Sequence, residues 1–341
     1  MATKLLIIGS HYYYDLGLML LRSASSLGIE ARICSNFLPD YAPSMNHILG
    51  KLFFKIAGKR PFEWWNFNQK VITLINHFQP ELILVTGIFP LSNKVFKSAA
   101  KNNAKVVNYL TDNPYILRHK SPYFIKNISS YDLILSTKRR LIPSLVKKGA
   151  RRVEFMFFAF DPSWNHIPDP HLTNYTKNFT ADISFIGAGS SERLPELEAL
   201  SSLGNLNLQL YGDGWSKIHI NGWKKNPQIS GDDFRLAIYS SKVTLGLLRK
   251  SNSDDSTMRT FEIPACGGCG IYEDTPEHRD LLIDYPEYGF FNSPLDLAHK
   301  CQWLLHHPQE LQEMRQKGFD LIVKYTNTYA SRLEKIFELV L

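Results

Sequence analysis

The chain alternates short apolar runs with segments in which apolar residues recur every three or four positions. The apolar runs predict buried parallel strands, and the periodic segments predict helices that cover a sheet. Leu16–Leu27 is one such helix, ended by Gly28. The strands predicted in the first half are Lys4–Gly9, Glu30–Cys34, Glu81–Ile88, Ala104–Leu110, Tyr131–Thr137 and Arg151–Phe160. The other helices predicted there are about Ser92–Asn102 and Arg140–Lys148.

A proline-rich stretch, Asp161–Pro170, separates this half from a second half that repeats the alternation. The strands predicted in the second half are Asp182–Gly187, Asn207–Gly212, Val243–Leu248 and Gly270–Glu273. Helices are predicted from about Arg193, from Asp233, Pro276 and Pro294, and finally from Thr328. We therefore predict an α/β fold of two Rossmann-like domains, residues 1–165 and 166–327, which face each other across a cleft, with a C-terminal helix at 328–341.

Composition narrows the class of protein. The chain has 341 residues, of which 44% are hydrophobic and 21% charged, as in soluble globular domains. No apolar run approaches the about 20 residues that span a bilayer, and Met1–Ser10 is too short and too strand-like for a signal peptide. Four cysteines are too few for a disulfide framework in a chain of this size. These features predict a cytoplasmic protein.

The segment Ser253–Gly268 holds the largest concentration of candidate ligand-binding residues. Asp254 and Glu262 stand eight positions apart. Between them lie Arg259 and three hydroxyl residues, Ser256, Thr257 and Thr260. A helix that begins here offers unpaired backbone N–H groups to an anion, and the arginine adds a fixed positive charge. The segment therefore predicts a nucleotide-sugar site, while an ordinary amphipathic helix with a polar face is the alternative.

This segment resembles the donor-binding motif of retaining GT-B glycosyltransferases, in which two glutamates separated by seven residues precede an Ala-Cys-Gly stretch. Met258–Gly268 is most similar to the CgeB-like branch, the spore-maturation glycosyltransferases. Asp254 stands where the family has its first Glu. The resemblance implies that Glu262 holds the ribose, that Asp254 orients the sugar, and that the backbone of Ser256 and Thr257 binds the diphosphate. It also implies retention of configuration and a last helix that crosses back to the first domain.

Two glycine loops follow strands of the second half. The first contains Gly187, Gly189 and Arg193, and similar residues in CgeB-like proteins imply phosphate binding. The second, Tyr211–Trp215, looks like the family's Tyr-Gly-x-Gly-Trp loop, with Tyr211, Gly212, Gly214 and Trp215 near the nucleotide base. Plain glycine turns remain the alternative for both loops.

Two residues of the first half are candidates for binding or activating the acceptor. Asp112 follows a strand in a Thr-Asp-x-Pro sequence that the resemblance also covers, and it is a candidate catalytic or acceptor-binding carboxylate. His11 follows the first strand and is the other candidate. A local Asx turn for Asp112 and an incidental loop position for His11 are the alternatives.

The formal net charge of +7 is unevenly distributed. Lys51–Trp65 interleaves cations with large apolar residues, and Lys138–Arg152 holds a second basic cluster. This mixture suits the anionic inner face of a membrane or a lipid-linked acceptor, and a solvated basic face is the alternative. No nucleic-acid-binding module is recognised.

The sequence gives no reason to expect a metal or other cofactor. It has no Asp-x-Asp pattern, and Cys266 and Cys269 lack a second pair of ligands at zinc spacing, so we expect both to be packing residues. We predict a metal-independent glycosyltransferase that moves a sugar from a nucleotide diphosphate sugar to a hydroxyl acceptor, such as a glycan or a lipid-linked one. A nucleotide-sugar epimerase of the same fold and a non-catalytic nucleotide-sugar-binding protein are the alternatives.

Overall fold

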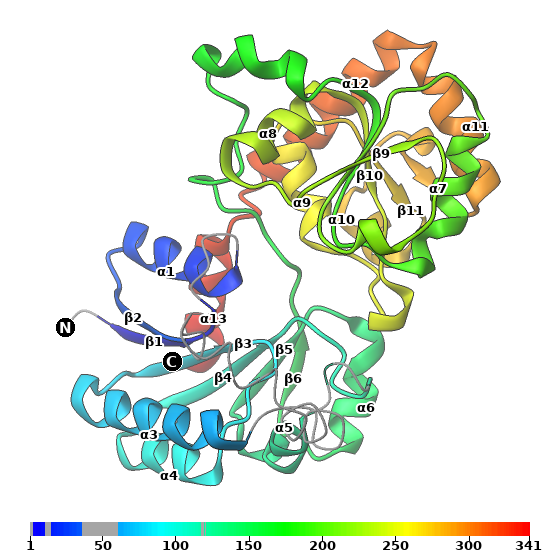
Figure 1. The fold of residues 1–341 in the computed structure, drawn as a ribbon. Coiled ribbons are helices and arrows are strands. Elements are labelled where there is room, and N and C mark those ends of the chain that lie inside the picture. Colours follow the sequence, from blue (N-terminus) through cyan, green and yellow to red (C-terminus); the bar gives the residue numbers. More distant parts are fainter. Residues whose placement is uncertain (1–2, 11–14, 36–60, 117–118, 120) are drawn as a thin grey trace. The chain divides into compact units, whose positions relative to one another are not determined.

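The computed structural model describes residues 3–10, 15–35, 61–116, 119 and 121–341, whose strands form two parallel sheets (Figure 1). The chain divides into two compact units. The first consists of Met1–Phe157, Ser251–Ser253 and Tyr329–Leu341, and the second of Phe158–Lys250 and Asp254–Thr328. The predicted α/β fold with two Rossmann-like domains is confirmed.

The first unit contains a six-stranded sheet in the order β2-β1-β3-β4-β5-β6. Its strands are β1 Lys4–Ile8, β2 Glu30–Cys34, β3 Leu82–Thr86, β4 Lys105–Leu110, β5 Leu133–Ser136 and β6 Val153–Phe155. Its helices are α1 Leu16–Ser26, α3 Pro61–Phe78, α4 Asn93–Lys101, α5 Pro122–Lys126, α6 Ile142–Lys147 and α13 Tyr329–Val340. All five residues of β3 are buried, as expected for a strand covered on both faces.

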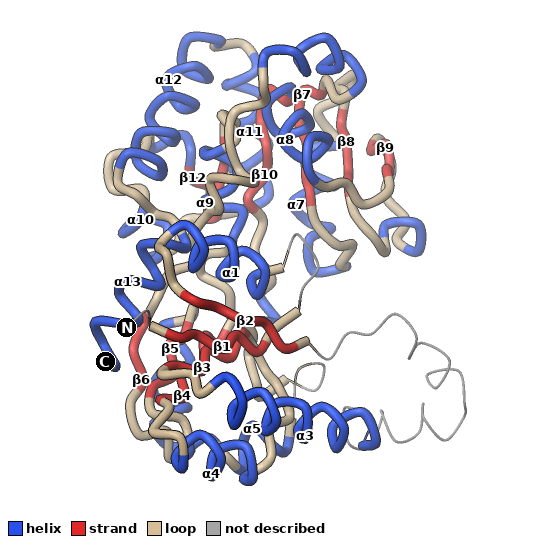
Figure 2. Tube along the Cα trace, turned by 90° about the vertical axis from the view of Figure 1, so that its left-hand side faces the viewer, coloured by secondary structure: helices blue, strands red, loops and turns tan. Residues whose placement is uncertain are grey.

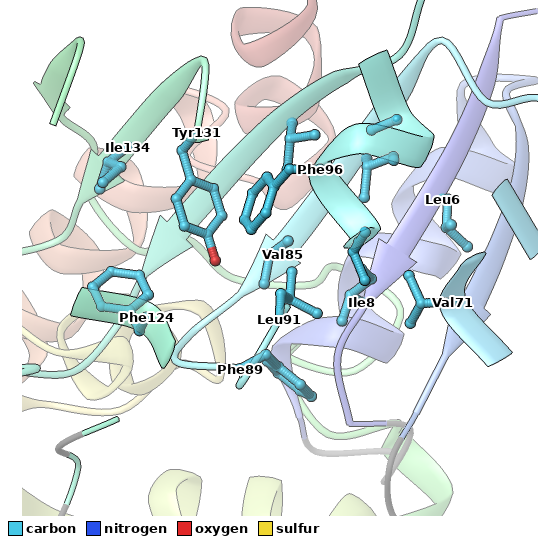
Figure 3. Close-up of a cluster of buried hydrophobic side chains, with 14 of the residues drawn as sticks. Leu6, Ile8, Val71, Val85, Phe89, Leu91, Phe96, Phe124, Tyr131 and Ile134 are labelled. Atoms are coloured by element: carbon cyan, nitrogen blue, oxygen red, sulfur yellow. The ribbon is translucent and has the colours of Figure 1, made fainter. Parts of the chain in front are cut away.

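Helices cover both faces of this sheet. α3 packs with α4 on one face, and α1 packs with α13 on the other (Figure 2). Figure 3 shows the core on the α3 and α4 side, where Ile8 and Val71 lie near Val85. The last helix of the chain, α13, thus belongs to the first unit and packs against α1.

The second unit contains a six-stranded sheet in the order β12-β11-β10-β7-β8-β9. Its strands are β7 Ala181–Ile186, β8 Leu208–Tyr211, β9 Trp223–Asn226, β10 Ser241–Gly246, β11 Gly270–Glu273 and β12 Phe290–Phe291. Its α-helices are α7 Leu194–Ser201, α8 Gly231–Ser240, α9 Met258–Ala265, α10 Pro276–Leu281, α11 Pro294–Leu305 and α12 Pro308–Phe319. α7 and α11 pack together, and α9 packs against α12 (Figure 1).

The structure differs from the sequence prediction at several elements. The strand predicted at Arg151–Phe160 is only Val153–Phe155, because β6 is an edge strand whose pairing with β5 ends there. Helices α3, α5 and α12 and strands β9 and β12 were not predicted. The predicted domain change at 165 and 166 lies eight residues after the last residue of the first unit's main segment, Phe157 (165 minus 157).

Candidate active site

The main candidate site lies in the second unit, at the carboxyl end of β7. This strand has β8 on one side and β10 on the other, so the order of strands across the sheet reverses here (Figure 2). Ligands of open α/β sheets bind beyond the carboxyl ends of the strands at such a switch point. The predicted donor-site residues of the second half lie at the end of β8 and on the loops and helices that follow β7, β8 and β10.

The two predicted glycine loops pack against each other. The N–H of Gly187 donates to Tyr211 O at 2.8 Å, and the N–H of Gly189 donates to Asp213 O at 2.7 Å. A Cβ atom on Gly189 would lie 2.7 Å from the carbonyl carbon of Gly214. Gly212 has a φ of +144°, and a Cβ there would lie 2.3 Å from the carbonyl oxygen of Gly187. Glycine is therefore required at these positions for the loops to approach each other.

The aromatic side chains of the second loop belong to the core. Trp215 is 1% exposed, donates from Nε1 to Gly187 O at 2.9 Å and meets the Phe185 ring edge-on. Tyr211 is buried as well. These side chains fix the loops, so the backbone of the loops is what this region offers to a ligand.

Arg193 places a buried positive charge beside the first loop. The residue is 7% exposed, and its Nη1 donates to Ala188 O at 2.7 Å. Its guanidinium lies 4.8 Å from the centroid of the Phe185 ring. Its Nε has no hydrogen-bond partner among the residues that the structure describes. Burial lowers the pKa of Arg193 to about 10, which leaves the group charged at neutral pH. A buried cation with a donor to spare suits an anionic ligand.

Arg259 and Glu262 form an ion pair on α9. Arg259 donates from Nε to Ile186 O at 2.8 Å, which attaches the first turn of α9 to the end of β7. Its Nη1 pairs with Glu262, a carboxylate that is almost fully buried. The predicted phosphate-binding arginine and the predicted ribose-binding acid are thus in direct contact, and Arg193 and Arg259 both bond the chain that leaves β7.

The predicted hydroxyl residues at the start of α9 serve the protein's own structure. The N–H of Thr257 donates to Thr260 Oγ1 at 3.3 Å, and Ser256 donates from Oγ to Glu277 at 2.7 Å. The N–H groups of Met258 and Arg259 lie in the first turn, where a helix provides no acceptor for them. These two groups, rather than the N–H of Thr257, are the backbone donors that the helix start leaves for an anion.

Asp254 contacts an arginine that the sequence analysis did not identify. The Asp254 side chain is 2% exposed, and its Oδ2 lies 3.6 Å from Nε of Arg249. Arg249 follows the end of β10 and lies four positions before Ser253, the first residue of the motif at Ser253–Gly268. The position of Arg249 between the end of a predicted strand and the Ser253–Gly268 motif could have identified it as a candidate from the sequence.

Asp112 lies in the first unit, after β4. Thr111 donates to its Oδ2 at 3.1 Å, and Asn252 donates to its Oδ1 at 3.2 Å. His119 Nδ1 lies 3.7 Å from the same Oδ1. A carboxylate beside an imidazole is a suitable acid or base pair, and no spacing in the sequence indicated His119. His11, the other candidate of this half, lies outside the described residues.

The described part of the chain has neither a candidate metal-binding cluster nor a membrane-spanning helix. It holds no group of three or more His, Cys, Asp and Glu residues arranged to bind a metal ion. None of the helices found there is long and apolar enough to cross a bilayer. Cys266 and Cys269 are buried free thiols, as expected for packing residues, and burial raises the pKa of Cys269 to about 12.

One family model matches the second half of the chain. Residues 193–338 match the family model described as glycosyl transferase-like. The matched residues include Arg193 and the whole of α9. No curated protein sequence matches the chain.

Solved structures share the fold over both units, which is the GT-B fold. Sucrose-phosphate synthase from Thermosynechococcus elongatus aligns with a TM-score of 0.70 at 12% identity, covering 99% of this chain and 98% of the synthase. The Anabaena protein Alr3699/HepE, solved with UDP and glucose, aligns with a TM-score of 0.65 at 11% identity over 99% of each chain. The T4 phage protein BGT, solved with UDP-glucose, aligns with a TM-score of 0.62 at 16% identity over 99% of each chain.

Proposed function

We propose that this protein transfers a sugar from a UDP-sugar to a hydroxyl acceptor, with retention of configuration and without a metal ion. The observation that carries the proposal is the convergence of buried Arg193 with the Arg259–Glu262 pair at the end of β7. Solved structures of the same fold that contain UDP or UDP-glucose support uridine diphosphate as the carrier. The Met258–Gly268 sequence supports a place in the CgeB-like branch.

The arginines would act on the leaving group. Negative charge grows on the diphosphate as its bond to the sugar breaks, and a fixed cation that binds this charge lowers the barrier. Arg193 and Arg259 would supply two such cations, and the first turn of α9 would add backbone donors and its helix dipole. Two guanidinium groups would thereby do the work that a divalent cation does in metal-dependent transferases.

The remaining roles divide between the two units. Glu262 would accept hydrogen bonds from the ribose hydroxyls, which orients the nucleotide relative to the arginines. The loops with Gly187 and Gly212 would present their backbone to the nucleotide. Asp112 would orient or activate the acceptor hydroxyl in the first unit, and His11 remains a prediction for the same task.

We also propose that the protein works in the cytoplasm, at the inner face of an anionic membrane. Lys147, Lys148 and Arg151 are exposed, in keeping with this proposal. Lys138, part of the predicted basic cluster, is instead buried and donates from Nζ to Thr111 O at 2.8 Å. Of the other predicted stretch, Lys51–Arg60 lies outside the described residues.

A thermal-shift panel of nucleotide sugars, followed by a turnover assay with and without EDTA, tests the proposal. A ligand that binds only the folded state raises the unfolding temperature with concentration. We expect the largest shift with UDP-sugars, and release of UDP that EDTA does not reduce. Sugar isomerisation without transfer would identify an epimerase, and binding without turnover would identify a non-catalytic binding protein.

A further inference from the structure

Arg249 follows β10, which pairs in parallel with β7, so it lies at the same edge of the second sheet as Arg193 and Arg259. We call these three arginines the cation cluster. Arg249 Nε lies 3.6 Å from Asp254 Oδ2, and the N–H of Asp254 donates to Arg249 O at 3.3 Å. The loop between β10 and α9 therefore closes on itself at these two residues. The carboxylate is 2% exposed, whereas the guanidinium side chain is 33% exposed. A buried acid thus faces an arginine that is partly exposed to solvent.

The positive charges of Arg249 and Arg259 both disfavour the protonated form of Arg193. Each lowers the pKa of Arg193, in addition to the larger effect of burial, in keeping with the position of Arg193 and Arg249 beyond the carboxyl ends of two paired strands, β7 and β10. Asp254 and Glu192 act in the opposite direction on Arg193. Like charges brought together under a partly buried surface repel one another, and an anion that binds between them removes this repulsion.

Two arginines of the cluster contact a carboxylate, whereas Arg193 donates to a backbone carbonyl oxygen. Arg259 pairs with Glu262, and Arg249 faces Asp254. Arg193 bonds the carbonyl oxygen of Ala188, and its Nε is unpartnered within the described part of the chain although the residue is only 7% exposed. This donor gives the site a second feature, besides the helix start, that points to an anionic ligand.

We infer that Arg249 is a further binding residue for the diphosphate, and that Asp254 positions Arg249 rather than orienting the sugar. The inference rests on the proposed function, because it assigns residues to the leaving group of the same reaction. An acid almost fully removed from solvent and facing a guanidinium is poorly placed to accept hydrogen bonds from a sugar, but its charge attracts that guanidinium and favours one orientation of it. Asp254 is therefore a positioning residue.

Calorimetric titration of the full chain with UDP, uridine and inorganic pyrophosphate tests this assignment. The variants are Arg249→Gln, Asp254→Asn and the double variant, with Arg279→Gln as the matched control. Arg279 is an arginine of the second unit that pairs with Asp274 and Glu287 instead. Uridine has no phosphate, so it reports the nucleoside part of the site alone.

Arg249→Gln is expected to weaken UDP and pyrophosphate by about tenfold or more and to leave uridine unchanged, since a hydrogen bond to a charged group is lost. Asp254→Asn is expected to give a smaller loss with the same pattern. The double variant is expected to lose less than the product of the single losses, because the two residues act as a unit. Arg279→Gln is expected to bind like the wild type.

Unchanged UDP and pyrophosphate affinity in folded Arg249→Gln would overturn the inference and leave the proposed function in place. Independent effects of the two substitutions would overturn the positioning role of Asp254. If the wild type binds pyrophosphate in an Arg249-dependent manner but not UDP, the assignment of Arg249 stands and the proposed donor is wrong. If it binds neither, both fail.

Discussion

Thr260 Oγ1 lies 3.0 Å from Nε2 of His278, an imidazole that burial keeps neutral. Nδ1 of His278 lies 2.7 Å from Glu273 O, and a carbonyl oxygen only accepts, so Nδ1 carries the proton. Nε2 must then accept from the Thr260 hydroxyl, which itself accepts from the N–H of Thr257. The start of α9 is thus tied to α10 by a chain of hydrogen bonds that needs a neutral histidine.

The second unit should therefore lose stability at mildly acidic pH. Burial lowers the pKa of His278 from 6.5 to about 4, with smaller opposing effects from the Glu273 carbonyl and Asp274. Between these values only the unfolded state binds the proton, so the free energy of unfolding falls as pH falls from 6.5 to 4. One pKa unit is worth about 1.4 kcal/mol, so the loss from His278 is about 3 kcal/mol. Denaturant unfolding at several pH values measures it.

His278→Gln is the control, because glutamine keeps a donor and an acceptor but does not titrate in this range. Its stability should depend less on pH between 6.5 and 4 than that of the wild type. Parallel curves for the two proteins would show that His278 does not cause the loss.

Glu262→Gln should weaken UDP and UDP-sugar by the same factor, about tenfold or more, because both ligands carry the ribose. Calorimetry of the two ligands measures the factor. Glu198→Gln is the matched control, an exposed acid on α7. A folded Glu262→Gln protein with wild-type UDP affinity would remove Glu262 from the site.

Arg193→Met should reduce kcat far more than it reduces uridine binding. Methionine fills part of the buried space and removes the charge that would stabilise the departing diphosphate. Loss of one such donor costs on the order of 100-fold in kcat. Steady-state kinetics with the best donor of the panel measures this, and turnover equal to that of the wild type would exclude Arg193 from the reaction.

Gly189→Ala should separate the two glycine loops. Its Cβ would lie 2.7 Å from the carbonyl carbon of Gly214 and 2.8 Å from the N of Trp215, which costs about 1–3 kcal/mol of stability. Gly204→Ala is the control: Gly204 has a φ of +69° and nothing within 4 Å of a Cβ, so alanine there costs stability through the backbone alone. UDP affinity should fall in Gly189→Ala and not in Gly204→Ala. Equal UDP affinity in both variants would show that the loops do not shape the site.

Lys51, Lys55, Lys59 and Arg60 changed together to Gln should abolish most sedimentation with acidic-lipid vesicles at low ionic strength. Each basic residue near an anionic surface contributes about 1 kcal/mol, and salt screens the attraction. The matched control changes four exposed lysines of the same unit to Gln, at Lys94, Lys97, Lys101 and Lys105. Equal recovery of the wild type with acidic and neutral vesicles would contradict the membrane proposal.

Strands buried on both faces were predictable because their apolar runs have no other stable environment. β3 and β7 follow from such runs. The edge strand β9, Trp-Lys-Lys-Asn, was missed because exposed lysines hide its pairing with β8. Helix α3 could have been predicted from the sequence, because its buried apolar residues recur every three or four positions, at Phe67, Val71, Ile75 and Phe78.

The site was only partly predictable. Local sequence pointed to Arg193, Arg259 and Glu262, but a spacing cannot show which side chains turn inward. Ser256 and Thr260 are used by Glu277 and His278, and these contacts join residues about 20 positions apart, so they arise only from the packing of α9 on α10. The contact of Asp254 with Arg249 likewise depends on the path of a loop.

The central claim is that the cation cluster at the end of β7 recognises a nucleotide through its diphosphate. Calorimetric titration of the full chain with UDP and with uridine, in the presence of EDTA, tests it most directly. Charge-assisted hydrogen bonds to the diphosphate predict that UDP binds at least about tenfold more tightly than uridine without a metal ion. Equal affinity for the two ligands, or UDP binding that EDTA abolishes, would contradict the account.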